Sequence, residues 1–221
     1  MLNAILVPGR PDKEEYYDPK YPTNSNNHWF PWLSKQLQIN DVFAVAIEPP
    51  KPWQPRYDIW TREFEKFDIT PETVLVGHSC GGGFLVRWLS ENKDKKVGTV
   101  VLVAPWLNPE DNPVSDTADF FDFEIDPDIV NRTAGVTIFN SDNDQATIHK
   151  SVQIIRDTVK DIRYKEFHNH GHFCLEDMNK AKSAAQPPVD TLFPDGLRKG
   201  ADRQPFIQCD KKQGERCRSV V

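Results

Sequence analysis

Short apolar segments alternate with segments of helical periodicity along the first 178 residues of the chain. Apolar runs typical of buried strands occupy residues 3–7, 42–47, 73–76, 97–103 and 136–140, and residues 162–167 are predicted as a further strand. Between these runs, apolar residues recur every three or four positions, which predicts amphipathic helices around residues 29–37, 60–67, 84–89 and 148–159. Asp58 is placed to cap the second of these helices. The alternation predicts an α/β fold, with a mostly parallel central sheet and helices on both faces.

The segment LVGHSCGGGFL, residues 75–85, places Ser79 at the turn between a predicted buried strand and a predicted helix. Gly77 and Gly81 flank the serine at the spacing G-x-S-x-G, which allows the backbone to bend sharply and exposes the hydroxyl as a nucleophile elbow. A phosphate-binding loop is the alternative. Such a loop carries G-x-x-x-x-G-K-[ST], and no lysine follows these glycines.

A nucleophilic serine needs a base, and the base needs an acid that holds its tautomer. In sheets of this kind the acid and the histidine follow the serine along the chain, each in a loop after a strand. Asp142 and Asp144 follow the strand at 136–140, and both are also ordinary turn residues. His172 is the expected base, because Gly171 permits a sharp turn after the last strand.

Three histidines alternate after the last predicted strand, and His168 and His170 are expected to belong to the strand end. Alternate residues of a strand point the same way, so the three side chains offer a second interpretation as metal ligands. No further histidine or cysteine pair at ligand spacing supports it. We expect neither a metal nor an organic cofactor.

Two predicted connections exceed the usual two to six residues of α/β loops, namely 9–28 and 105–135. Both leave the carboxyl ends of strands, where open α/β sheets bind ligands. They are candidate walls or a lid for a site above Ser79. Simple surface loops are the alternative.

Composition narrows the possibilities further. The 221 residues, 38% hydrophobic and 27% charged, suit one globular domain with a sizeable core. No apolar run approaches the roughly 20 residues of a membrane span, and the N-terminal MLNAILVPGR resembles a strand more than a signal peptide. Four cysteines without a C-x-x-C motif favour a cytoplasmic protein. The net charge of −6 disfavours a nucleic-acid partner.

The charge is unevenly distributed. Residues 179–221 contain nine Lys and Arg against five Asp and Glu, a net +4, which leaves −10 on residues 1–178. This tail also contains four prolines and no sustained periodicity. We predict an α/β domain over residues 1–178, followed by a disordered or divergent basic tail over 179–221. A basic binding arm is the functional alternative.

Together these features resemble the small α/β-hydrolase family of retinoblastoma-binding protein 9. The resemblance covers most of residues 3–178, and the segments that carry it are ILVPG, HWFPWLSKQL, VLVGHSCGGGFLVRWLSE, VVLVAPW, IFNSDND and HGHF. Many hydrolases share the elbow, whereas its combination with H-W-x-x-W-L near the N-terminus is more specific.

The resemblance implies an α/β-hydrolase-like three-layer sandwich and a serine hydrolase that cleaves small ester or amide substrates. Its triad maps onto Ser79 as nucleophile, Asp144 as acid and His172 as base, which favours Asp144 over Asp142. Three features depart from the family. The connection after the first strand is longer than in the human member of the family, so we expect substrate access to differ. No final amphipathic helix is evident after HGHFCLEDM, and no L-x-C-x-E sequence occurs, so binding to the retinoblastoma protein is not supported.

The remaining candidate residues surround the predicted elbow. The backbone N–H of Cys80 is the expected first oxyanion donor, and Arg10 is the nearest candidate for the second. The substrate-binding candidates are His28, Trp29 and Trp106, with helix packing as the alternative for Trp29.

Two other functional interpretations remain at this stage. A non-catalytic protein that keeps the hydrolase pocket as a binding module is the first. The second is a redox-sensitive hydrolase, which would use Cys80 beside the serine and Cys174 beside the base; both cysteines also suit a role as small core residues.

Overall fold

The computed structural model of this chain describes residues 2–108 and 118–174. The predicted domain boundary near residue 178 and the predicted basic tail lie outside the described residues. In the described part of the chain, no helix is long and apolar enough to cross a bilayer.

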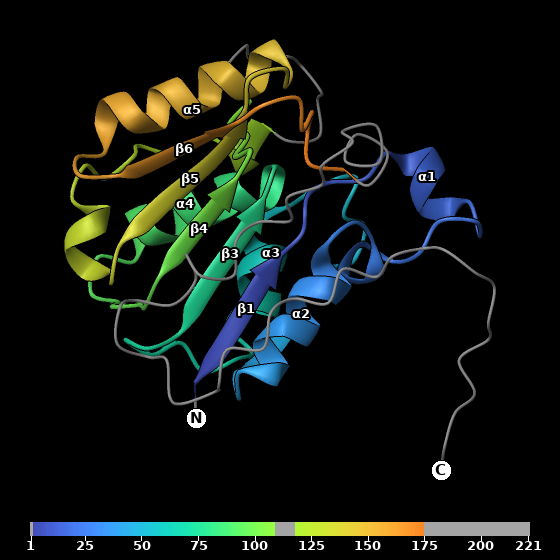
Figure 1. Cartoon of the computed structure of the whole chain (residues 1–221), viewed down its shortest axis with the longest axis horizontal. Coiled ribbons are helices and arrows are strands. Elements are labelled where there is room, and N and C mark those ends of the chain that lie inside the picture. Colours follow the sequence, from blue (N-terminus) through green and yellow to red (C-terminus); the bar gives the residue numbers. More distant parts are fainter. Residues whose placement is uncertain (1, 109–117, 175–221) are drawn as a thin grey trace, which may run out of the picture.

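Six parallel strands form a single sheet in the order β2-β1-β3-β4-β5-β6 (Figure 1). Their bounds are Asn3–Val7 (β1), Phe43–Ala46 (β2), Val74–His78 (β3), Val100–Val103 (β4), Val136–Ser141 (β5) and Arg163–Phe167 (β6). All six predicted strands are confirmed. Strand β4 begins three residues later than predicted, because the chain around Gly98 still forms the turn that leads into it.

The predicted helices are also present. They are α2 (Phe30–Ile39), α3 (Tyr57–Phe64), α4 (Cys80–Glu91) and α5 (Ala146–Thr158). In Figure 1, α2 lies in front of the sheet and α3 and α4 lie behind it, which confirms the layered arrangement. A short helix, α1 (Lys13–Tyr17), and a 3-10 turn, Asn24–Asn26, interrupt the long connection after β1.

Helix α3 starts differently from the prediction. Arg56 occupies the N-cap position with extended dihedral angles, and Asp58 lies within the first turn. The prediction that Asp58 caps the helix is therefore wrong. Its carboxylate instead pairs with the Arg56 guanidinium at 2.9 Å, where it also faces the positive end of the helix dipole.

The central strands and the two helices behind them form the core. Every residue of β3, β4 and β5 is buried, which explains why these segments are largely apolar and do not alternate between apolar and polar residues. Edge-to-face aromatic pairs join α3 to α4, with Phe64 lying 5.3 Å from Phe84 and 5.1 Å from Trp88 between ring centroids. This packing fixes α4 behind the carboxyl end of β3.

Helix α4 passes unusually close to the end of β1. A Cβ atom placed on Gly81 would lie 2.1 Å from the Val7 carbonyl oxygen and 2.5 Å from that of Pro8. No side chain larger than hydrogen fits there unless one of the two backbones moves. Gly82 is less confined than Gly81, because the nearest atom to a Cβ placed on Gly82 would be the Pro105 side-chain carbon Cβ, at 2.9 Å.

Gly81→Ala is therefore expected to lower the free energy of unfolding by about 3 kcal/mol or more, since a methyl group would overlap a strand backbone. Gly82→Ala is the matched control in the same helical turn. We expect a smaller loss there, because the gain in helix propensity of about 1 kcal/mol offsets part of the contact. Urea unfolding of both variants checks this, and equal midpoints for wild type and Gly81→Ala would contradict it.

Candidate active site

Ser79 occupies a strained turn between β3 and α4. Its backbone has φ 54° and ψ −121°, a conformation that costs on the order of 1–3 kcal/mol outside glycine. Three hydrogen bonds stabilise it: the Ser79 N–H donates to Val103 O at 2.9 Å, and the Ser79 carbonyl accepts from Trp106 N and Gly83 N at 3.0 and 3.1 Å. The turn presents the half-buried serine at the carboxyl edge of the sheet.

His172 and Asp144 meet beyond the ends of β6 and β5. The His172 Nδ1 atom lies 3.0 and 3.1 Å from the two carboxylate oxygens of Asp144. The Asp144 side chain is fully buried, whereas the His172 side chain keeps 18% of its surface exposed. A hydrogen bond from Nδ1 to a carboxylate makes Nε2 the acceptor nitrogen of the neutral ring.

Asp142 belongs to a different group of side chains. It accepts a hydrogen bond from the Asn169 N–H at 2.8 Å and pairs with the exposed ring of His168. The bond from Asn169 and the contact with His168 together lower the pKa of the Asp142 carboxyl. The residues alone left open whether Asp142 or Asp144 pairs with the base. In the structure, Asp144 is the one of the two that contacts His172.

The three alternating histidines do not converge on a common point. Strand β6 ends at Phe167, so the expectation that His168 and His170 belong to the strand is wrong. His170 is buried against Phe167 and Phe173, and its Nδ1 lies 2.9 Å from His168 O. Within residues 2–108 and 118–174, no group of three His, Cys, Asp or Glu side chains is arranged to hold a metal ion.

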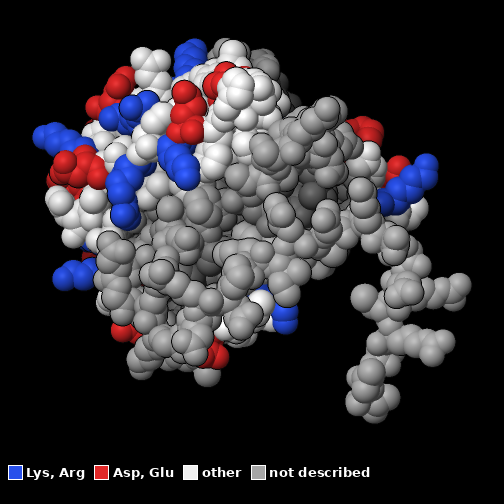
Figure 2. All heavy atoms as spheres, in the orientation of Figure 1, with Lys and Arg blue, Asp and Glu red and all other residues white. Residues whose placement is uncertain are grey.

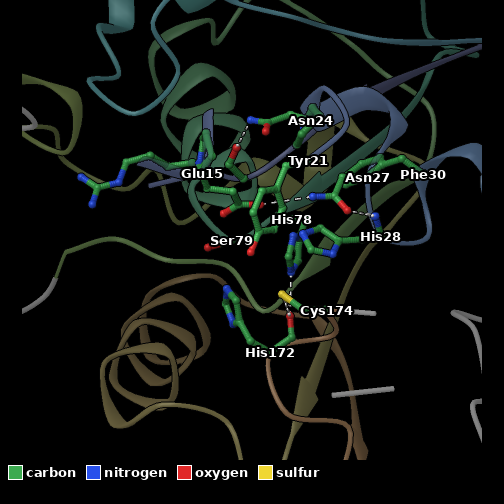
Figure 3. A pocket seen from close by; sticks show the side chains of 14 residues that line it. Glu15, Tyr21, Asn24, Asn27, His28, Phe30, His78, Ser79, His172 and Cys174 are labelled. Atoms are coloured by element: carbon green, nitrogen blue, oxygen red, sulfur yellow. Dashed lines mark hydrogen bonds between the residues drawn. The ribbon is translucent and has the colours of Figure 1, made fainter. Parts of the chain in front are cut away.

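A cavity of about 450 Å³ opens beside Ser79 and His172 (Figure 3). Most of its lining comes from the connection between β1 and α2, so residues 9–28 form a wall of this cavity as predicted. The second predicted connection, 105–135, contributes none of the described lining residues. The residues around it are Pro8, Gly9, Arg10, Pro11, Glu15, Tyr21, Asn24, Asn27, His28, Phe30, His78, Ser79, His172 and Cys174. Glu15, Tyr21, Asn24 and Asn27 were not singled out in the sequence, because the connection has no periodicity that indicates which side chains point inward.

His78 links the elbow to the loop that carries His172. Its Nε2–H donates to the His172 carbonyl oxygen at 2.8 Å, and the two rings lie 4.9 Å apart. Burial lowers the pKa of His78 well below its usual value, and the neighbouring rings of His172 and His28 lower it further. His78 is therefore neutral at physiological pH. The sequence signal for it was a histidine at the end of an otherwise apolar strand.

Cys80 and Arg10 flank the serine from two different strands. Cys80 is the fully buried first residue of α4, and burial raises the pKa of its thiol although the positive charge of Arg10 opposes the shift. A buried, protonated thiol suits packing and disfavours a redox role. Cys174 is half-buried and lines the cavity. Arg10 also lines the cavity, in the connection that follows β1.

The predicted substrate contacts divide into two groups. His28 lines the cavity, whereas Trp29 and Trp106 do not. Trp29 is only 1% exposed and stacks on Phe30 with ring centroids 4.2 Å apart. Its position therefore fits the alternative interpretation, in which Trp29 serves helix packing. The ring of Trp106 packs edge-to-face on Phe121, with ring centroids 5.1 Å apart.

Comparison with known proteins places the chain in a family. Residues 18–179 match the sequence model of the family described as Serine hydrolase. The chain belongs to the serine hydrolase family. It is 36% identical over 95 residues to the putative hydrolase YdeN of Bacillus subtilis (strain 168), an alignment that covers 42% of this chain and 50% of YdeN. This serine hydrolase thus spans half the length of that curated relative.

Solved structures share the fold of this serine hydrolase. The ydeN gene product of B. subtilis superposes with a TM-score of 0.63 at 23% identity, covering 85% of this chain and 94% of that one. A putative hydrolase from Agrobacterium vitis S4 gives 0.56 at 13% identity, with 87% and 88% covered. These likenesses show an α/β-hydrolase-like fold and nothing narrower. The resemblance to the family of retinoblastoma-binding protein 9 stays a prediction.

Proposed function

We propose that this serine hydrolase cleaves small ester or amide substrates through an acyl-enzyme on Ser79, with His172 as base and Asp144 as acid. The observation that carries the proposal is the pairing of a fully buried carboxylate with a histidine that lines the same cavity as the elbow serine. A carboxylate buried on a histidine ring is the arrangement that fixes the tautomer a general base requires. No metal or organic cofactor is part of the proposed reaction.

The proposed acylation begins when His172 Nε2 accepts the proton of Ser79 Oγ. The oxygen forms a bond to the substrate carbonyl carbon, and the π electrons of the carbonyl move onto its oxygen. As the tetrahedral intermediate collapses, the bond to the alcohol or amine breaks and the leaving group takes the proton from His172. Asp144 stabilises the imidazolium ion throughout. Water then enters in place of the leaving group, and the same steps release the acid.

Two backbone N–H groups are the proposed donors to the developing oxyanion. Cys80 N lies at the positive end of α4, and Arg10 N lies in the connection after β1 that borders Ser79. Within the part of the chain that the structure describes, neither N–H donates a hydrogen bond to the protein. Each such donor contributes about 3 kcal/mol to the stabilisation of a transition state.

The cavity supports a small, partly polar acyl substrate. Its volume of about 450 Å³ lies in the range of small-molecule sites, and amide, phenol and imidazole groups line it beside prolines and Phe30. His28 is the proposed substrate contact, since it lines the cavity in the connection between β1 and α2. On the face shown in Figure 2, acidic and basic side chains of the described residues are interspersed, which offers no single-sign patch for a nucleic acid.

The wild-type protein is expected to gain one covalent adduct with a fluorophosphonate, because a serine activated by a base attacks an electrophilic phosphorus that surface serines ignore. It should also hydrolyse a short-chain p-nitrophenyl ester. Mass spectrometry of the Ser79 peptide and the absorbance of p-nitrophenol measure these outcomes.

Ser79→Ala is the control for both experiments, since loss of one oxygen at a half-buried turn leaves a small cavity and the fold intact. Cys80→Ala should still label, because the cysteine contributes a backbone N–H and not its thiol. An absence of adduct in the folded wild type, with no turnover of esters or amides, would favour a non-catalytic binding module instead.

Asp144→Asn is expected to lower kcat by a factor on the order of 10⁴, if this triad behaves like the well-studied Ser-His-Asp example. The amide would favour the wrong tautomer of His172, while the geometry stays intact. Asp142→Asn is the matched control two residues away, and it should change kcat by less than about tenfold because its carboxylate contacts His168. Steady-state kinetics on one ester compare them, and reversed penalties would refute the assignment of Asp144.

A further inference from the structure

Asn24 contacts the backbone next to Ser79 from within the long connection after β1. Its Nδ2–H donates to the Gly9 carbonyl oxygen at 3.0 Å. Gly9 itself borders the serine, because a Cβ atom placed on Gly9 would lie only 3.1 Å from Ser79 Cβ. In Figure 3 the dashed line from Asn24 runs toward the side of the cavity on which Ser79 lies. The bond therefore acts on the peptide that borders the nucleophile.

This hydrogen bond fixes the direction of the Arg10 N–H. Gly9 O and Arg10 N belong to the same peptide, and the structure contains no cis bond among its described residues. In a trans peptide the C=O and N–H groups point in opposite directions, so a carbonyl held by Asn24 directs the N–H away from Asn24. Pro8 and Pro11 flank the peptide and limit its alternatives, because proline restricts its own φ and the residue before it.

Asn24 is itself held in place from the neighbouring strand. It begins the 3-10 turn Asn24–Asn26, and the N–H of the next residue, Ser25, donates to Glu48 Oε1 at 2.8 Å. Glu48 follows β2, the strand that pairs with β1. The Gly9–Arg10 peptide is thus connected through Asn24 and Ser25 to the chain beyond β2, and it does not depend on its own strand alone.

We propose that Asn24 is a positioning residue of the oxyanion site, which orients the Arg10 N–H toward the substrate carbonyl oxygen before the substrate binds. The inference rests on the proposed function of Ser79 and adds a residue to it. Preorganised donors stabilise the transition state because they need not reorient when negative charge develops. The connection between β1 and α2 would then serve two purposes, as the cavity wall and as the support of the second donor.

Asn24→Asp tests the inference with almost no change in side-chain shape. An aspartate accepts but cannot donate at this position, so it would face the Gly9 carbonyl oxygen without a hydrogen bond. We expect kcat for a p-nitrophenyl ester to fall about 10- to 100-fold, somewhat less than the loss of a whole oxyanion donor, with KM within about threefold. Asn24→Ala removes the donor without adding charge and should act in the same direction.

Asn26→Asp is the matched control. Asn26 lies in the same 3-10 turn, and its amide donates to two neighbours in the chain, Thr23 Oγ1 at 2.9 Å and Ser25 Oγ at 3.4 Å. This variant should keep kcat within about twofold of wild type. Thermal melts of all three variants exclude general unfolding as the cause of a difference.

Inhibition by two ketones separates positioning from structure. Ser79 Oγ adds to the carbonyl carbon of an aryl trifluoromethyl ketone and passes its proton to His172, which leaves an oxyanion like that of the transition state. The matching methyl ketone stays planar and resembles the ground state. For Asn24→Asp, Ki of the trifluoromethyl ketone should rise by the same factor as kcat/KM falls, while Ki of the methyl ketone stays unchanged.

Three results would overturn the inference. The first is unchanged kcat and trifluoromethyl ketone affinity in both Asn24 variants, while wild type turns over and Ser79→Ala does not; this leaves the proposed function intact. The second is an equal loss in Asn26→Asp, which would indicate a general disturbance of the turn. The third is a wild type that neither labels at Ser79 nor hydrolyses esters, which would remove the proposed function as well.

Discussion

Helix α4 approaches the end of β1 so closely that a methyl group on Gly81 would lie 2.1 Å from the Val7 carbonyl oxygen. This contact between two backbones lets the chain reverse at Ser79 with φ 54°, directly from a buried strand into the helix. It also brings the Cys80 N–H and the Gly9–Arg10 peptide to the same serine from two adjacent strands. The geometry at the sheet edge therefore depends on glycine at Gly81, and the backbone leaves similarly little space at Gly77 and Gly83.

Hydrogen bonds from buried groups hold the opposite side of the cavity. Asp144 accepts from the ring of His172, while the neutral ring of His78 donates to the His172 backbone carbonyl. Because His78 immediately precedes Ser79, the strand that presents the serine also holds the loop of His172. Serine, histidine and the Gly9 peptide are each held by hydrogen bonds to the backbone or to a buried or half-buried side chain, which is the rigidity that preorganised catalysis requires.

The fold, Ser79 and His172 followed from local patterns in the sequence, whereas only the family resemblance favoured Asp144 over Asp142. The buried central strands are largely apolar, and the glycines around Ser79 have a steric cause that the sequence displays directly. The cavity wall was less accessible to prediction. Asn24 lies in a connection without periodicity, where long-range contacts alone decide which side chains face inward. Trp29 and Trp106 illustrate the same limit, because an aromatic residue near a site fits core packing as readily as a substrate contact.

The central claim is that Ser79 is a nucleophile that faces two fixed backbone donors. A crystal structure of the phosphonylated protein tests it most directly, because the adduct places a phosphoryl oxygen where the oxyanion would form. The account predicts phosphorus bonded to Ser79 Oγ, with the phosphoryl oxygen about 2.7–3.1 Å from both Cys80 N and Arg10 N. Phosphorus on another residue, or a phosphoryl oxygen that points to solvent, would contradict it.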